Sequence, residues 1–102
     1  VWQLLLIHCT GTEPQVTTAA ARDLAEFLHR VISQKGKNIM LVGPADASIA
    51  KISDVYRKVI YMKAPEYATL VACKDLVERK IKNNSTFSNV SVQFDFNPTS
   101  GF

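Results

Sequence analysis

The pattern of apolar and polar residues in the first half of the chain predicts a strand, a helix and a second strand. Residues 2–9 (WQLLLIHC) are apolar at both odd and even positions, which is typical of a strand buried on both faces. Pro14 opens a helix in which apolar residues recur at helical spacing. These residues are Val16, Ala20, Leu24, Phe27, Leu28 and Val31. Residues 38–42 (NIMLV) predict a short strand that ends at Gly43-Pro44.

The second half of the chain repeats this order. Residues 55–63 (VYRKVIYMK) predict a third strand, and Pro65 opens a second helix. The apolar stripe of that helix consists of Leu70, Cys73, Val77 and Ile81. Residues 89–96 (NVSVQFDF) alternate between apolar and polar, which favours a half-buried strand at the edge of a sheet.

The order β-α-β-β-α-β predicts an α+β, ferredoxin-like fold: a four-stranded antiparallel sheet with both helices on one face. The apolar first strand suits a central position and the alternating last strand suits an edge. We expect residues 1–102 to form a single domain, because this length supports one hydrophobic core. The chain begins inside a predicted strand, so we expect it to be part of a longer protein.

Composition and motifs exclude several classes of protein. With 47% apolar and 21% charged residues, the chain is typical of a globular domain rather than a disordered one. The longest apolar run, Leu4 to Ile7, is too short to span a bilayer. No phosphate-binding loop and no nucleophile elbow occurs. We therefore predict no catalytic residues in this chain.

The two cysteines, Cys9 and Cys73, fall at predicted buried positions and are expected to be reduced thiols. His8 and His29 share no metal-ligand spacing with them, so no metal site is predicted.

RNA-recognition motifs share this strand order but carry aromatic residues on one face of the first and third strands. Tyr56 and Tyr61 fall on opposite faces of the predicted third strand, and the first strand supplies only Trp2. This class is disfavoured.

The positive charge of the chain is concentrated in one segment. The formal net charge is +3, and residues 51–63 hold four basic residues against one acid, whereas basic and acidic residues balance elsewhere. Two interpretations are open. The basic residues could be solvated charges that protect the edge of a sheet, or they could form a patch that faces phosphates.

The segment from Leu41 to Lys63 reads LVGPADASIAKISDVYRKVIYMK, and the chain closes with Asp95-Phe96-Asn97-Pro98. This segment resembles the C-terminal domain of primosomal protein N′, the PriA family of replication-restart helicases. That family carries Leu-Gly-Pro-Ala-Pro-Ala-Pro-Ile, then Lys or Arg, then Tyr/Trp-Arg before an apolar strand, and it ends in Asp-Val-Asp-Pro. The resemblance covers essentially the whole chain. Its specific part is the connector between the second and third predicted strands, residues 41–58. The departures are Asp46, Ser48, Lys58 and Asn97.

The resemblance implies a function for the parent protein: binding of abandoned replication forks, ATP-driven 3′-to-5′ unwinding of DNA and reassembly of the primosome in the bacterial cytoplasm. It implies that the parent uses ATP, Mg and Zn, with no cofactor in this part. The domain itself would be non-enzymatic. It would contact forked or single-stranded DNA, pack on the helicase lobes and meet primosome proteins, with no membrane partner.

The residues expected to bind DNA are Lys51, Tyr56, Arg57, Lys58 and Lys63. Arg57 and Lys58 are neighbours on a predicted strand, so at most one lies on the helix-free face. We choose Arg57, because the resemblance places an Arg there.

The connector residues Gly43, Pro44 and Ile49 are expected to stop the second strand and to dock against the helicase lobes. The alternative function is a docking scaffold that binds no DNA.

In some members of the family the domain also helps to bind the acidic tail of single-stranded-DNA-binding protein, through an Arg and a Gln at the start of the second helix. Those positions are Tyr67 and Val71 in this chain. Neither side chain pairs with a carboxylate as Arg does. Lys63 and Lys74 are the nearby candidates to replace them.

Overall fold

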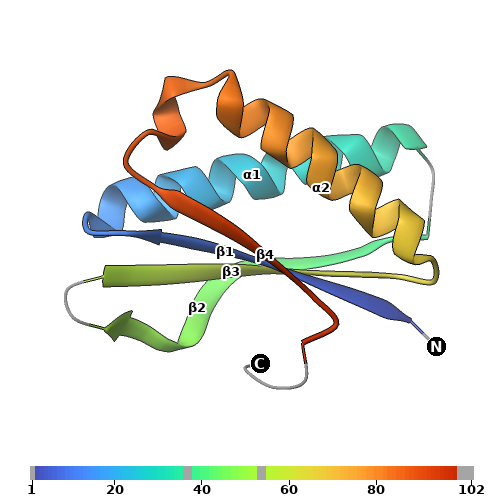
Figure 1. Ribbon diagram of the computed structural model, residues 1–102, viewed down its shortest axis with the longest axis horizontal. Coiled ribbons are helices and arrows are strands. Elements are labelled where there is room, and N and C mark those ends of the chain that lie inside the picture. The colour runs from blue at the N-terminus through green and yellow to red at the C-terminus, as the bar shows by residue number, and fades with distance from the viewer. Residues whose placement is uncertain (1, 36–37, 53–54, 99–102) are drawn as a thin grey trace.

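The computed structural model has the element order β-α-β-β-α-β, with a short 3₁₀ helix before the last strand (Figure 1). It describes residues 2–35, 38–52 and 55–98, and for residues 35 and 47–52 it describes the backbone only. The elements are β1 (Gln3–Gly11), α1 (Pro14–Lys35), β2 (Met40–Ile52), β3 (Val55–Ala64), α2 (Tyr67–Lys82), η1 (Ser85–Phe87) and β4 (Ser91–Phe96).

The four strands form one antiparallel sheet in the order β2-β3-β1-β4. Figure 1 shows both helices on the same side of this sheet. The predicted ferredoxin-like fold is confirmed, with β1 in a central position and β4 at an edge. This arrangement leaves the other side of the sheet without a helix.

The core lies between the sheet and the helices. Alternate residues of the two central strands enter it: Leu5, Ile7 and Cys9 from β1, and Ile60, Met62 and Ala64 from β3. The predicted stripes of both helices face the core, where Phe27 and Ile81 are partly buried, and the exception is Val16, which is 39% exposed. Thr17 is buried in its place, and its hydroxyl donates to the carbonyl of Glu13 at 2.8 Å. That hydrogen bond satisfies the polar group that this position buries.

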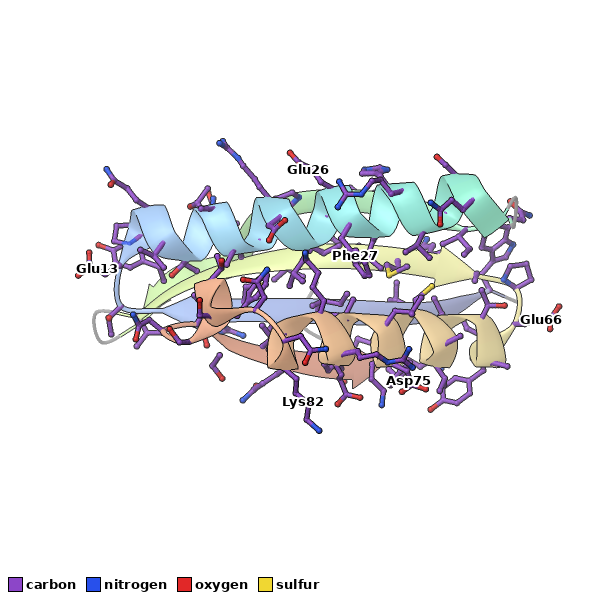
Figure 2. The ribbon with its side chains drawn as sticks, turned by 90° about the horizontal axis from the view of Figure 1, so that it is seen from above. Glu13, Glu26, Phe27, Glu66, Asp75 and Lys82 are labelled. Atoms are coloured by element: carbon purple, nitrogen blue, oxygen red, sulfur yellow. The ribbon has the colours of Figure 1, made fainter. Side chains whose placement is uncertain are left out.

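The outer surfaces of the two helices are polar (Figure 2). Figure 2 shows Phe27 between the helices, whereas Glu26 points away from α2. Lys80 joins the two helices, because its Nζ lies 3.7 Å from a carboxylate oxygen of Asp23 and 5.2 Å from the centre of the Phe27 ring. The helical side of the molecule is therefore a solvated layer with charges of both signs.

The predicted end of the second strand at Gly43-Pro44 is wrong. β2 continues to Ile52, so the expected connector is the distal half of a long edge strand. Its pairing with β3 shifts register between Val42 and Ala45 and again between Asp46 and Lys51. Bulges of this kind bend a strand without ending it. In Figure 1 the distal half of β2 accordingly bends away from the helices.

Asn97 joins the end of β4 to the start of β1. Its backbone has φ 47°, a left-handed conformation that Asn tolerates better than most residues. Its N–H donates to the carbonyl of Leu4 at 2.8 Å, and its Oδ1 accepts from the N–H of Leu4 at 2.8 Å. Its Nδ2 also donates to Oε1 of Gln3 at 2.9 Å. An Asp at this position would have no amide hydrogens with which to make this last bond.

We expect Gly43→Ala to destabilise the fold by about 1 to 3 kcal/mol. Gly43 has φ 114°, which L side chains rarely adopt, and an added Cβ would lie 2.8 Å from the carbonyl oxygen of Val59. The measurement is the midpoint of urea unfolding. A midpoint equal to that of the wild-type chain would show that the bulge does not require glycine.

Candidate nucleic-acid interface

The sheet has a helix-free side, which we call the open face. It is defined by the register of the strands, because residues paired across neighbouring strands share a face. β1 contributes Leu4, Leu6, His8 and Thr10; β3 contributes Arg57, Val59, Tyr61 and Lys63; β4 contributes Ser91, Gln93 and Asp95; β2 contributes Met40 and Val42.

Two of the predicted DNA-binding residues lie on the open face, near the two ends of β3. Arg57 is paired with Thr10, and Lys63 is paired with Leu4 on one side and Met40 on the other. Neither forms an ion pair with a carboxylate of the described residues. The choice of Arg57 over Lys58 for the helix-free face agrees with this geometry.

Lys58 and Tyr56 lie on the opposite side of β3, towards the start of α1. The Nζ of Lys58 is 2.6 Å from Oδ1 of Asp46, the residue paired with it on β2. Tyr56 and Lys58 line a hollow of about 200 Å³ together with Pro14 and Thr17, and Arg57 also borders it. The charge of Lys58 is therefore offset locally, and its side chain does not share the open face with Arg57.

The remaining predicted residues lie in β2. Gly43 and Pro44 form the first register shift of the strand. The backbones of Ile49 and Lys51 belong to the distal half of β2, where Lys51 is paired with Tyr56. The side chains of Ile49 and Lys51 lie outside the described part of the structure, so their predicted contacts stay predictions.

His8 stands at the centre of the open face. Its Nδ1 is buried and has no hydrogen-bond partner among the described residues. Burial lowers the pKa of His8 below 6.5, the nearby Arg57 guanidinium lowers it further, and Asp95 acts in the opposite direction. The ring is therefore mostly neutral at pH 7. As the pH falls below 6.5 towards the lowered pKa, the unfolded chain takes up a proton on His8 more readily than the folded chain does, so the free energy of unfolding decreases.

The open face also has an apolar part that sequence reasoning missed. Leu6 and Val59 are each only 1% exposed although they face away from the helices. Met40 and Val42, in contrast, are 53% and 57% exposed at the β2 edge, and Trp2 is 43% exposed just before β1. Met40 and Val42 belong to the predicted strand 38–42, but their place beside Lys63 and Tyr61 depends on strand pairing, which the sequence pattern does not give.

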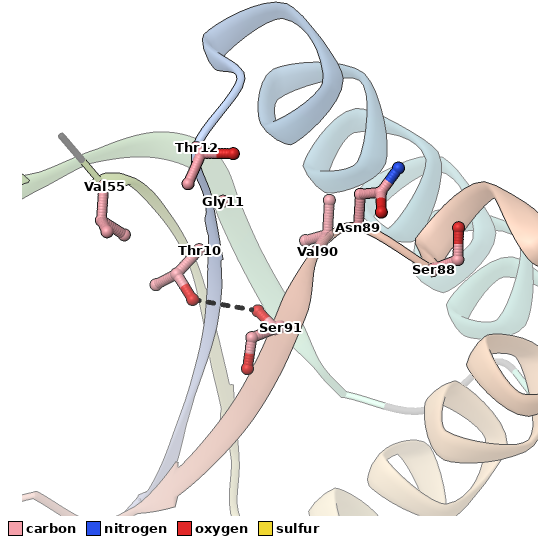
Figure 3. A pocket seen from close by; sticks show the side chains of 8 residues that line it. All are labelled: Thr10, Gly11, Thr12, Val55, Ser88, Asn89, Val90 and Ser91. Atoms are coloured by element: carbon pink, nitrogen blue, oxygen red, sulfur yellow. Dashed lines mark hydrogen bonds between the residues drawn. The ribbon is translucent and has the colours of Figure 1, made fainter.

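A hollow of about 540 Å³ adjoins the Arg57 end of the open face. It is lined by Thr10, Gly11, Thr12, Val55, Ser88, Asn89, Val90 and Ser91 (Figure 3). The Thr10 hydroxyl donates to the carbonyl of Ser91 at 3.4 Å. Because Thr10 is paired with Arg57, this hollow adjoins the end of β3 that carries Arg57.

At the start of α2, the two positions of the acidic-tail pocket carry other contacts. The Tyr67 ring lies 5.1 Å from the Phe96 ring, and Val71 is half-buried. The Nζ of Lys74 lies 3.1 Å from Asp75 and 3.0 Å from Glu78, and these carboxylates raise its pKa. Lys74 is thus already paired, whereas Lys63 is exposed.

The two cysteines belong to the core and not to the open face. Cys9 and Cys73 are buried thiols, as predicted, and burial raises the pKa of Cys9 to about 12. The described residues contain no cluster of His, Cys, Asp or Glu that could hold a metal ion. None of the described helices combines the length and apolarity needed to cross a membrane.

Comparison with known proteins decides the family. The sequence profile of the primosomal protein N C-terminal domain matches residues 1–99. The chain belongs to this family. The resemblance to this family is therefore confirmed, and it supports a primosomal role in general. No match is found among curated protein sequences.

Solved structures support the fold. The de novo designed protein Foldit4 is similar with a TM-score of 0.65 and 10% identity, over 98% of this chain and 100% of its own. The de novo designed protein LFR1 1, with a ferredoxin fold, has a TM-score of 0.63 and 12% identity, over 99% of this chain and 88% of its own. A hydantoinase/carbamoylase family amidase from Burkholderia ambifaria has a TM-score of 0.62 and 16% identity, over 98% of this chain and 28% of the amidase chain. At these identities the likeness shows the fold alone.

We expect Arg57→Gln to raise the pKa of His8, because it removes the positive charge nearby. The pKa should remain below 6.5, because burial is the larger cause of its shift. Asp95→Asn should lower the pKa, because it removes the opposing charge. An NMR titration of the His8 ring measures both changes. Equal pKa values in all three proteins would mean that neither charge faces His8.

Proposed function

We propose that this domain binds DNA through the open face of its sheet and so helps a replication-restart helicase to hold a stalled fork. The observation that supports it best is the position of Arg57 and Lys63. Both cations lie on the helix-free side of the central strand β3, and no described carboxylate pairs with either. Such cations can replace the counterions of a phosphate backbone.

The other predicted residues have less support than Arg57 and Lys63. Lys51 is included on the basis of the family resemblance. Lys58 is paired with Asp46 at 2.6 Å, so a phosphate would have to compete with that carboxylate. Tyr56 lies on the same side as Lys58, beside the hollow at the start of α1. Arg57 and Lys63 therefore carry the proposed contact, and Lys58 and Tyr56 would be secondary.

The domain would act as a binding part within the parent protein and not as a catalyst. The parent would supply the ATP-dependent motor with its Mg and Zn. The domain would orient the fork relative to the helicase lobes and bring primosome proteins to it.

A second candidate function is docking without DNA. The exposed apolar residues Met40, Val42 and Trp2 favour it, because a helicase lobe or a primosome protein could cover them. A site for the tail of single-stranded-DNA-binding protein has less support, because Lys74 is already paired and Tyr67 packs on Phe96.

Arg57→Gln and Lys63→Gln should each reduce the slope of log affinity against log salt by about 0.7 to 0.9 for DNA binding, as expected for one lost phosphate contact. Lys58→Gln is the matched control, because it removes one positive charge from the same strand. Its effect on the slope should be smaller, since Asp46 already offsets that charge. Fluorescence anisotropy with labelled DNA measures all three slopes.

Two results would contradict the proposal. If Arg57→Gln and Lys63→Gln leave the slope unchanged, the open face is not the DNA surface. If the wild-type chain does not bind DNA at low salt, the docking function takes precedence.

A further inference from the structure

We propose that the open face takes single-stranded rather than duplex DNA, and that Tyr61 is the residue on which a base stacks. This inference rests on the proposed function and adds a ligand class and a residue to it. It begins from the register of β3, in which Arg57, Tyr61 and Lys63 share the helix-free side. The sequence pattern had disfavoured the RNA-recognition class, because Tyr56 and Tyr61 fall on opposite faces and the first strand supplies only Trp2.

The order of these side chains along β3 is charge, ring, charge. At about 3.4 Å per residue, Tyr61 lies about 14 Å from Arg57 and about 7 Å from Lys63 along the strand. Single-stranded DNA is bound in general by cations that follow its backbone and aromatic rings that stack on its bases. One strand here supplies both kinds of group in one line.

The cross-strand partners of Tyr61 are apolar. Its partners across the sheet are Leu6 on β1, which is buried, and Val42 on β2, which is 57% exposed. Met40, 53% exposed, is paired with Lys63. Duplex DNA keeps the faces of its bases stacked inside and offers phosphates and groove edges. A single strand offers base faces that could cover this apolar surface, so the combination of cations and exposed apolar side chains favours it.

The charge on the open face also sets the path of the strand. Asp95 and Gln93 lie on the β4 side, and Asp95 would repel phosphates. The cations lie on β3, next to the exposed apolar residues of β2. A bound strand would therefore follow β3 and the β2 edge from Arg57 to Lys63, and it would not cross β1 towards β4.

The test compares two variants against two DNA probes. Tyr61→Leu removes the ring and keeps an apolar side chain, whereas Tyr61→Phe keeps the ring. The probes are an oligodeoxythymidylate of about 12 nucleotides, within the site size of single-strand binders, and a duplex of the same length. Tyr61→Leu should weaken binding of the single strand by about 5-fold to 100-fold, as for one lost stacking contact. Tyr61→Phe should bind like the wild-type chain, and duplex binding should be the same in all three proteins.

A second readout uses the unaltered chain. Trp2 is the one tryptophan of the sequence. It lies two residues before Leu4, which is paired with Lys63. Its fluorescence should change more with the oligodeoxythymidylate than with the duplex. This measurement does not depend on the folding of a variant.

The outcomes separate this inference from the proposed function. Reduced salt slopes for Arg57→Gln with unchanged single-strand affinity for Tyr61→Leu would overturn the stacking role and keep the DNA surface. Equal loss of single-strand and duplex binding in Tyr61→Leu would also overturn it. Binding of a protein partner but of neither DNA probe would overturn both proposals.

Discussion

The antiparallel pairing of β1 with β3 is the constraint on which the rest of the structure depends. It places Ile7 opposite Ile60 and Leu5 opposite Met62, so that both strands send their apolar residues into the same core. The alternate positions then necessarily share the open face. A shift by one residue would exchange the two sets and bury Arg57 and Lys63, which is why the core fixes the position of the charges.

The bent edge strand β2 gives the open face its asymmetry. Its first residues add exposed Met40 and Val42 beside Lys63 and Tyr61. Beyond the register shift at Gly43 and Pro44, Asp46 is paired with Lys58 on the helical side. The bulge therefore coincides with a change in surface, from apolar residues beside cations that no described carboxylate pairs with to the ion pair between Lys58 and Asp46. A nucleic-acid strand on β3 would meet the first of these surfaces and not the second.

Much of this fold could be predicted from the sequence. The two helical stripes and the alternating last strand each have a strong period, the first strand is continuously apolar, and tertiary packing follows these patterns. The failures have local causes. Gly43-Pro44 was interpreted as the end of a strand, because Gly-Pro is a turn dipeptide, yet a bulge at a sheet edge tolerates both residues. Val16 was assigned to the core from its type, whereas Thr17 takes the inward position with its hydroxyl bonded to Glu13.

The candidate site was only partly predictable. Alternation on one strand was sufficient to separate Arg57 from Lys58, and the structure agrees. The pairing of Lys58 with Asp46 could not be predicted, because it requires the register of β2 beyond the bulge. The grouping of Tyr61 with Val42 and Leu6 likewise depends on pairing between strands that are distant in sequence.

The most direct test of the central claim, that the open face meets DNA, is NMR of the methyl groups as single-stranded DNA is added. Exposed methyl groups report on each side: Met40 and Val42 on the open face, and Val16 on α1. The account predicts that the signals of Met40 and Val42 shift with DNA while the signal of Val16 does not. Shifts of Val16 with unchanged Met40 and Val42 would contradict it, because the DNA would then lie on the helical side.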